Sequence, residues 1–179
     1  MKKSTTKELV LAGLFLAIGL LLPFLTGQIP EIGSKLLPMH IPVLICGLVI
    51  GWKYGLAVGF ILPLLRNLLF GMPPLFPTGI SMAFELATYG LLCGLIFSTF
   101  KKQDVKALYI SLIGAMLGGR VVWGVVQAIL LGVSGSGFTM SMFMAGAFLN
   151  AIPGIILQLV LIPVLMVALD RAGMIKFRK

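Results

Sequence analysis

Long apolar segments, separated by short breaks rich in Gly, Pro or Lys, occupy most of this sequence. A helix needs roughly 20 apolar residues to cross the hydrocarbon core of a membrane. Only 11% of the residues are charged, whereas 59% are hydrophobic, and an ordinary soluble domain carries about twice that share of charge. The sequence therefore predicts an all-α integral membrane protein in which residues 1–179 form a single domain.

The breaks between the apolar segments predict a bundle of six transmembrane helices. Gly and Pro punctuate helices, and Lys ends an apolar run. We expect the helices at residues 8–26, 38–52, 54–71, 78–100, 106–131 and 143–171. The second segment is short, and we expect an earlier start near Lys35 if Pro38 occupies its first turn, where a missing N–H costs little.

The positions of Lys and Arg predict that both termini face the cytoplasm. Cytoplasmic loops carry an excess of these residues, and two cytoplasmic termini require an even number of spans. One side of the predicted bundle has a single cation, Lys35. The other side collects eleven: Lys2, Lys3, Lys7, Lys53, Lys101, Lys102, Lys106, Arg171, Lys176, Arg178 and Lys179. Because these cations mark the ends of apolar segments, the net charge of +9 does not indicate nucleic-acid binding.

Three ionisable residues, Arg66, Glu85 and Arg120, lie inside the predicted spans. Such residues are costly in a bilayer and usually line a cavity. At 1.5 Å per residue, Arg66 and Glu85 fall at similar depth, roughly 8–11 Å below the outer end. We expect them to pair, either as a structural tie or as part of a site. Arg120 then has no acidic partner, which makes it the favoured contact for an anionic ligand.

Further polar and aromatic side chains fall in the same outer half of the predicted bundle. They are His40, Asn67, Tyr89, Trp123, Gln127 and Asn150. Together with the three charges they predict a polar, substrate-binding pocket that opens to the outside. Hydrogen bonding between helices explains Gln127 or Asn150 equally well, and an interfacial position explains His40.

The sequence gives no basis for catalysis, and we expect neither a metal nor a cofactor. Cys46 and Cys93 lie within apolar segments, and His40 completes no recognised metal spacing with them. The chain has no G-x-x-x-x-G-K-[ST] phosphate loop and no Ser/His/Asp arrangement. We therefore do not expect an enzyme.

Small residues in the first predicted span, Ala12, Gly13 and Ala17, form another pattern. Gly13 and Ala17 are four residues apart, a spacing that allows a second helix to approach closely. The pair serves either packing within the bundle or docking of another membrane protein.

Two stretches of the chain resemble a known family. They are residues 37–47 (LPMHIPVLICG) and residues 55–79, the latter with Leu64-Leu65-Arg66-Asn67 and Gly71-Met72-Pro73-Pro74-Leu75-Phe76-Pro77-Thr78. With the six short spans, the basic N-terminus and the small-residue first span, nearly the whole chain resembles the substrate-binding S component of an energy-coupling factor (ECF) transporter.

This resemblance implies capture of a water-soluble vitamin or precursor from outside a prokaryotic plasma membrane. It also implies partnership with a transmembrane coupling subunit and two ATPase subunits, docked on the small-residue face of the first span. Pantothenate is the favoured substrate, since Arg66 and Arg120 against Glu85 leave one net positive charge. A pyridoxine-type vitamin is the alternative, with Tyr89, Trp123 or Phe84 as a stacking face; riboflavin or another precursor also stays open.

Two other classes of function stay open. A self-sufficient secondary transporter or channel needs a polar track to the cytoplasm, whereas the inner halves of the predicted spans are apolar. A non-transport membrane scaffold requires a protein partner for Arg120.

Overall fold

The computed structural model describes residues 5–26, 35–175 and 177, and within these ranges the chain is helical and contains no strand. The helices are α1 (Thr5–Leu21), α3 (His40–Val49), α4 (Trp52–Phe70), α5 (Ile80–Thr99), α6 (Val105–Val133), α7 (Met140–Ala147) and α8 (Ile152–Arg171). Short turns of 3-10 or π helix occupy Leu22–Thr26, Leu75–Gly79 and Leu149–Ala151. The prediction of an all-α fold is confirmed.

Five stretches of the described chain are long and apolar enough to cross a membrane. They are Thr5–Leu25, Trp52–Phe70, Leu75–Thr99, Val105–Val133 and Met140–Arg171. These stretches support a multi-pass membrane protein. The helix expected at 38–52 is shorter, because α3 has ten residues, which is about 15 Å of rise. The count of six spans therefore stays a prediction.

Backbone conformation at both ends explains why α3 is short. Leu37 has a φ of 51°, in the left-handed region that does not continue a right-handed helix. The expected start near Lys35 is therefore wrong, and α3 begins at His40. At the other end Gly51, with a φ of 125°, separates α3 from α4. The break expected at Trp52–Lys53 thus lies earlier, and Trp52 already belongs to α4.

The single helix expected at 143–171 is divided in two. Helix α7 ends at Ala147, and Phe148 leaves the helical conformation with φ −123° and ψ −64°. Helix α8 then begins at Ile152 with Pro153 in its first turn. Proline suits that position because its φ is preset and its missing N–H would have had no partner there.

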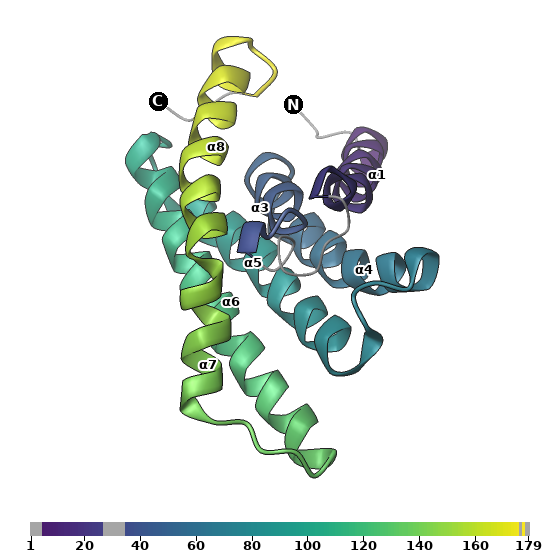
Figure 1. The fold of residues 1–179 in the computed structure, drawn as a ribbon. Coiled ribbons are helices and arrows are strands. Elements are labelled where there is room, and N and C mark those ends of the chain that lie inside the picture. The colour runs from purple at the N-terminus through teal and green to yellow at the C-terminus, as the bar shows by residue number, and fades with distance from the viewer. Residues whose placement is uncertain (1–4, 27–34, 176, 178–179) are drawn as a thin grey trace.

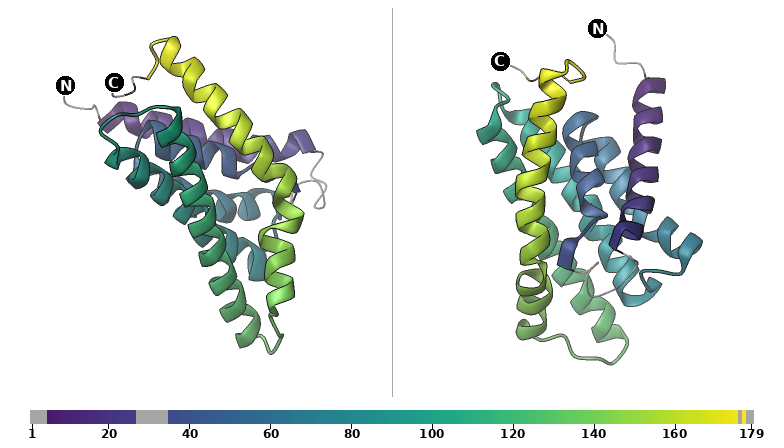
Figure 2. Two further views of the ribbon diagram at one scale, coloured as in Figure 1. Left: turned by 90° about the vertical axis from the view of Figure 1, so that its left-hand side faces the viewer. Right: turned by 45° about the horizontal axis from the view of Figure 1, so that its top comes forward.

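Helices α3 and α5 lie between α1 on one side and α6 to α8 on the other, whereas α4 passes below α1 and extends beyond it (Figure 1). Figure 2 shows that the start of α1 and the end of α8 lie at the same end of the bundle. The connection between α6 and α7 lies at the opposite end. This arrangement agrees with two chain ends on one side of a membrane, and the cytoplasmic assignment of that side stays a prediction.

Glycines bring the backbones of α3, α4 and α5 into direct contact. A Cβ added to Gly47 would meet the carbonyl oxygen of Gly90, and one added to Gly90 would meet that of Gly55. On the next turn of α4, a Cβ on Gly59 would meet the carbonyl of Leu86. Small residues allow such close approach between membrane helices, where van der Waals packing holds the bundle together.

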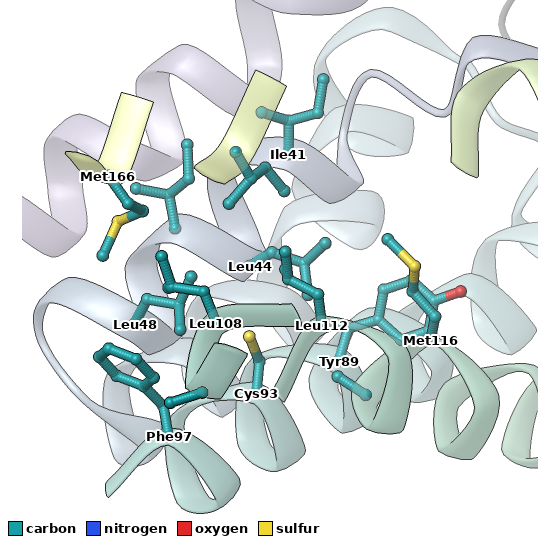
Figure 3. Close-up of a cluster of buried hydrophobic side chains, with 14 residues drawn as sticks. Ile41, Leu44, Leu48, Tyr89, Cys93, Phe97, Leu108, Leu112, Met116 and Met166 are labelled. Carbon is teal, nitrogen blue, oxygen red and sulfur yellow. The ribbon is translucent and has the colours of Figure 1, made fainter. Parts of the chain in front are cut away.

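An apolar cluster joins α3 to α5, α6 and α8 (Figure 3). Leu44, Cys93, Leu108 and Leu112 are fully buried within it. Cys46 is buried in a second cluster on the other side of α3, so both cysteines pack as small apolar side chains, as expected. Tyr89 also belongs to the cluster of Figure 3, and it carries a hydroxyl to the edge of this otherwise apolar group.

The glycine contacts predict a sharp stability effect at Gly90. We expect Gly90→Ala to lower the free energy of unfolding by about 1–3 kcal/mol. The new methyl group meets a backbone carbonyl that cannot move aside. Thermal unfolding of the protein in detergent measures the change. Gly132→Ala is the matched control, since nothing lies within 4 Å of a Cβ there; equal stability of the two variants would contradict the packing.

Candidate functional site

Three helices bring ionisable side chains together inside the bundle. Nη1 of Arg120 on α6 lies 2.9 Å from Oε1 of Glu85 on α5. Nε2 of His40, the first residue of α3, lies 3.5 Å from the same oxygen. The exposed fractions are 4% for Arg120 and 1% for Glu85 and His40. With Tyr89, whose ring meets that of His40 edge-on at 5.1 Å, these residues form the polar cluster.

Close packing of α6 on α5 positions two members of the polar cluster. A Cβ on Gly119 would strike the ring of Tyr89 and approach the carbonyl oxygen of Glu85 at 3.2 Å. Only a glycine therefore lets α6 come this near. Arg120 follows directly in the chain, so its buried guanidinium reaches the carboxylate one helix away.

A backbone anchor at the start of α3 positions His40. The carbonyl of Leu37 accepts a hydrogen bond from the His40 amide at 3.1 Å. The same carbonyl accepts from Nε2 of Gln158 on α8 at 3.5 Å. Gly154 allows this contact, because a Cβ there would meet the backbone of Lys35 and Leu36.

The expected ion pair between Arg66 and Glu85 is wrong. Nη1 of Arg66 donates to the carbonyl oxygen of Leu20 at 2.6 Å. Its guanidinium lies 5.3 Å from the ring centre of Phe24 and 5.4 Å from that of Phe70. Aromatic faces attract a cation, more strongly where it is desolvated. Arg66 therefore ties the end of α1 to α4.

The expectation that Arg120 lacks an acidic partner is likewise wrong, since Glu85 is that partner. Several atoms of the polar cluster nevertheless have no hydrogen-bond partner in the described part of the chain. They are Nε and Nη2 of Arg120, both ring nitrogens of His40, and Oε1 of Glu85. Oε1 lies within ion-pair distance of Nη1 of Arg120, but the angle between the two groups is not that of a hydrogen bond. Buried polar atoms are almost always hydrogen-bonded. These atoms are therefore the polar groups of the cluster that remain available for a hydrogen bond.

The other expected site residues lie apart from the polar cluster. Asn67 donates from Nδ2 to the carbonyl of Pro73 at 2.8 Å and so holds the loop after α4. Asn150 lies exposed in the break between α7 and α8. Gln127 is half-buried on α6, and its Oε1 has no partner among the described residues.

Of the three residues expected to stack on a ligand, one lies in the polar cluster and two lie outside it. Trp123 packs on Phe143 and Phe138, between α6 and α7. Phe84 is 44% exposed and meets Phe60 edge-on, outside the polar cluster. Tyr89 alone of the three belongs to that cluster. Gln158, which supports it through Leu37, was missed in the sequence, although a lone Gln inside the apolar run 152–169 marks such a position.

The three expected docking residues of α1 do not share one face, because Ala12 faces the bundle and Gly13 and Ala17 face away from it. Ala12 is buried in the cluster that joins α1 to α3 and α4. Gly13 and Ala17 are exposed on the surface of the bundle, and nothing lies within 4 Å of a Cβ on Gly13. The small-residue surface therefore consists of Gly13 and Ala17, and the placement of Ala12 on it is wrong.

Comparison with models of known protein families gives a match over most of the chain. Residues 7–166 match the family described as "ECF transporter, substrate-specific component". This range covers most of the chain, including all four residues of the polar cluster. No curated protein and no solved structure matches the chain significantly.

The polar cluster predicts coupled stability effects at Glu85 and Arg120. Removal of one partner strands a buried charge, which costs about 3–5 kcal/mol. We expect Glu85→Leu and Arg120→Leu each to lower the free energy of unfolding by that order, and the double variant to recover much of the loss. Thermal unfolding in detergent tests all three. Additive losses in the double variant would show that the ion pair does not stabilise the fold.

Proposed function

Because this chain belongs to the family of substrate-specific components of ECF transporters, we propose that it binds a water-soluble vitamin or precursor at the polar cluster, with pantothenate as the favoured substrate. Membership of the family implies a small-molecule substrate, a transmembrane coupling subunit and partner ATPases. We place the protein in a prokaryotic plasma membrane, with the polar cluster in the half that faces outward.

The free edge of the Arg120 guanidinium is the observation that carries this proposal. Nη1 lies against Glu85, whereas Nε and Nη2 are buried without partners in the described chain. These two nitrogens share one edge of the planar group, the fork that matches both oxygens of a carboxylate. Glu85 thus holds the guanidinium in orientation while the other edge receives the carboxylate of the substrate.

The charge of the polar cluster supports pantothenate for a different reason from the one expected. With Arg66 engaged by Phe24, Phe70 and Leu20, the charges of Arg120 and Glu85 cancel. An excess positive charge therefore does not select the substrate. A carboxylate is favoured by the shape of the free guanidinium edge, and the unpartnered nitrogens of His40 suit hydroxyl groups. Pantothenate carries both kinds of group.

Arg120→Lys provides the sharpest test of this site. Lysine keeps the positive charge beside Glu85, but it cannot present two fixed donors to a carboxylate. We expect the affinity for pantothenate to fall by about 1.5–3 kcal/mol, measured by calorimetry on the purified protein. Lys106→Ala, at the other end of α6, is the control and should bind normally. Unchanged affinity in Arg120→Lys would remove Arg120 from the site.

A pyridoxine-type vitamin is the second candidate, favoured by the buried ring of Tyr89 next to His40 and Glu85. Such a ligand would use an aromatic face and the carboxylate rather than the free guanidinium edge. Calorimetry with pantothenate and pyridoxine side by side distinguishes the two. Binding of pyridoxine that survives Arg120→Lys would favour this alternative.

Gly13 and Ala17 form the surface that we propose for docking of the coupling subunit. Both face outward from α1, and their small size leaves room for a helix to approach closely. Val10, Leu14 and Leu21 on the same side are exposed, so the surface offers apolar contacts around a shallow gap.

We expect Ala17→Trp to abolish ATP-dependent uptake in vesicles that contain the coupling subunit and both ATPases, because the indole fills the gap. Ligand binding by the purified variant should stay normal, since α1 contributes no residue to the polar cluster. Val125→Trp, on an exposed face of α6, is the control for bulk. Undiminished uptake by Ala17→Trp would place docking elsewhere, and uptake by the isolated chain would indicate a self-sufficient transporter.

A further inference from the structure

Helix α6 carries a second unpartnered polar group in line with Arg120. Gln127 follows Arg120 by seven residues, which is nearly two full turns. The two side chains therefore leave the same face of α6, separated by roughly 10.5 Å along its axis. Oε1 of Gln127 is buried and has no hydrogen-bond partner in the described chain, just like Nε and Nη2 of Arg120.

Aromatic rings pack on α6 at a level between Arg120 and Gln127. Gly124 projects from the same face at an intermediate level, and a Cβ there would strike the ring of Phe143 on α7. That ring is stacked on Trp123, with ring centres 6.3 Å apart and an angle of 27° between the planes. The face of α6 thus presents a cationic donor, then an apolar stretch, then a neutral acceptor.

We infer that Gln127 is a specificity-determining residue, whose amide oxygen accepts a hydrogen bond from a hydroxyl or N–H at the end of the substrate remote from its carboxylate. This inference rests on the proposed binding of a carboxylate at Arg120. The substrate class is an extended molecule with an acidic end, an apolar middle against Phe143, and a donor at the far end.

The chemistry of Gln127 suits such discrimination. Oε1 of Gln127 is a buried acceptor without a partner among the described residues, so a ligand that lacks the donor leaves it unpaired. A site built to hydrogen-bond a substrate group rejects the analogue that lacks this group far more strongly than an apolar pocket rejects an added one. Pantothenate meets the pattern, with its carboxylate and its terminal hydroxyl at opposite ends of a branched chain.

Calorimetry on the full-length protein with two probes tests the inference. The probes are pantothenate and an analogue in which hydrogen replaces the terminal hydroxyl. We expect the unaltered protein to bind the analogue at least about tenfold more weakly. In Gln127→Met, which keeps the length of the side chain but loses the acceptor, this preference should disappear. Val125→Met, on the exposed side of α6, should retain it.

The preference between probes, rather than the affinity itself, decides the outcome, so a general weakening of the variant does not obscure the result. A hydroxyl preference that persists in Gln127→Met overturns the role of Gln127 while leaving the proposed function intact. Equal binding of both probes by the unaltered protein overturns it as well. If the unaltered protein fails to bind pantothenate, the proposed substrate is wrong, and the inference falls with it.

Discussion

The buried contact between Glu85 and Arg120 is the interaction on which the rest of the site depends. Either charge alone would be costly inside a bilayer, and the pair makes both tolerable while leaving one edge of the guanidinium free. The contact requires α5 and α6 to lie closer than ordinary side chains permit. Gly119 provides this closeness, because any larger residue would displace the ring of Tyr89.

The two walls of the proposed site are built differently. On one side, α3, α4 and α5 touch through glycines, backbone against backbone, which leaves little freedom for their relative movement. On the other side, Trp123 of α6 meets Phe143 of α7 and Phe138 of the connection before α7, and a break at Phe148 separates α7 from α8. His40 and Glu85 thus lie on the glycine-packed helices, whereas Arg120 lies on the helix that also carries the aromatic contacts, a division that suits a charged substrate end and an apolar middle.

The sequence predicted the class of fold better than the partners of the polar residues. Apolar length and Gly or Pro breaks locate most helices, because crossing a membrane constrains both. Counting residues gives the height of Arg66 and Glu85 but not the direction in which each faces, and Arg66 turns to Phe24 and Leu20 instead. Leu37 precedes Pro38, a position that disfavours the helical conformation, but its left-handed φ and the hydrogen bond that its carbonyl accepts from Gln158 on α8 involve a distant part of the chain that local sequence does not indicate.

Helix α3 lies between the polar cluster and α1, which carries the proposed docking surface. Nine of its ten residues are buried, and its two faces belong to different clusters. Ile41, Leu44 and Leu48 pack with α5, α6 and α8, whereas Val43 and Cys46 pack with α1 and α4. His40, at its first turn, contacts Glu85. A ligand that draws on His40 therefore acts on a helix whose opposite face supports α1. Helix α3 thus joins the proposed ligand site to α1, which carries Gly13 and Ala17, through one continuous set of packed side chains.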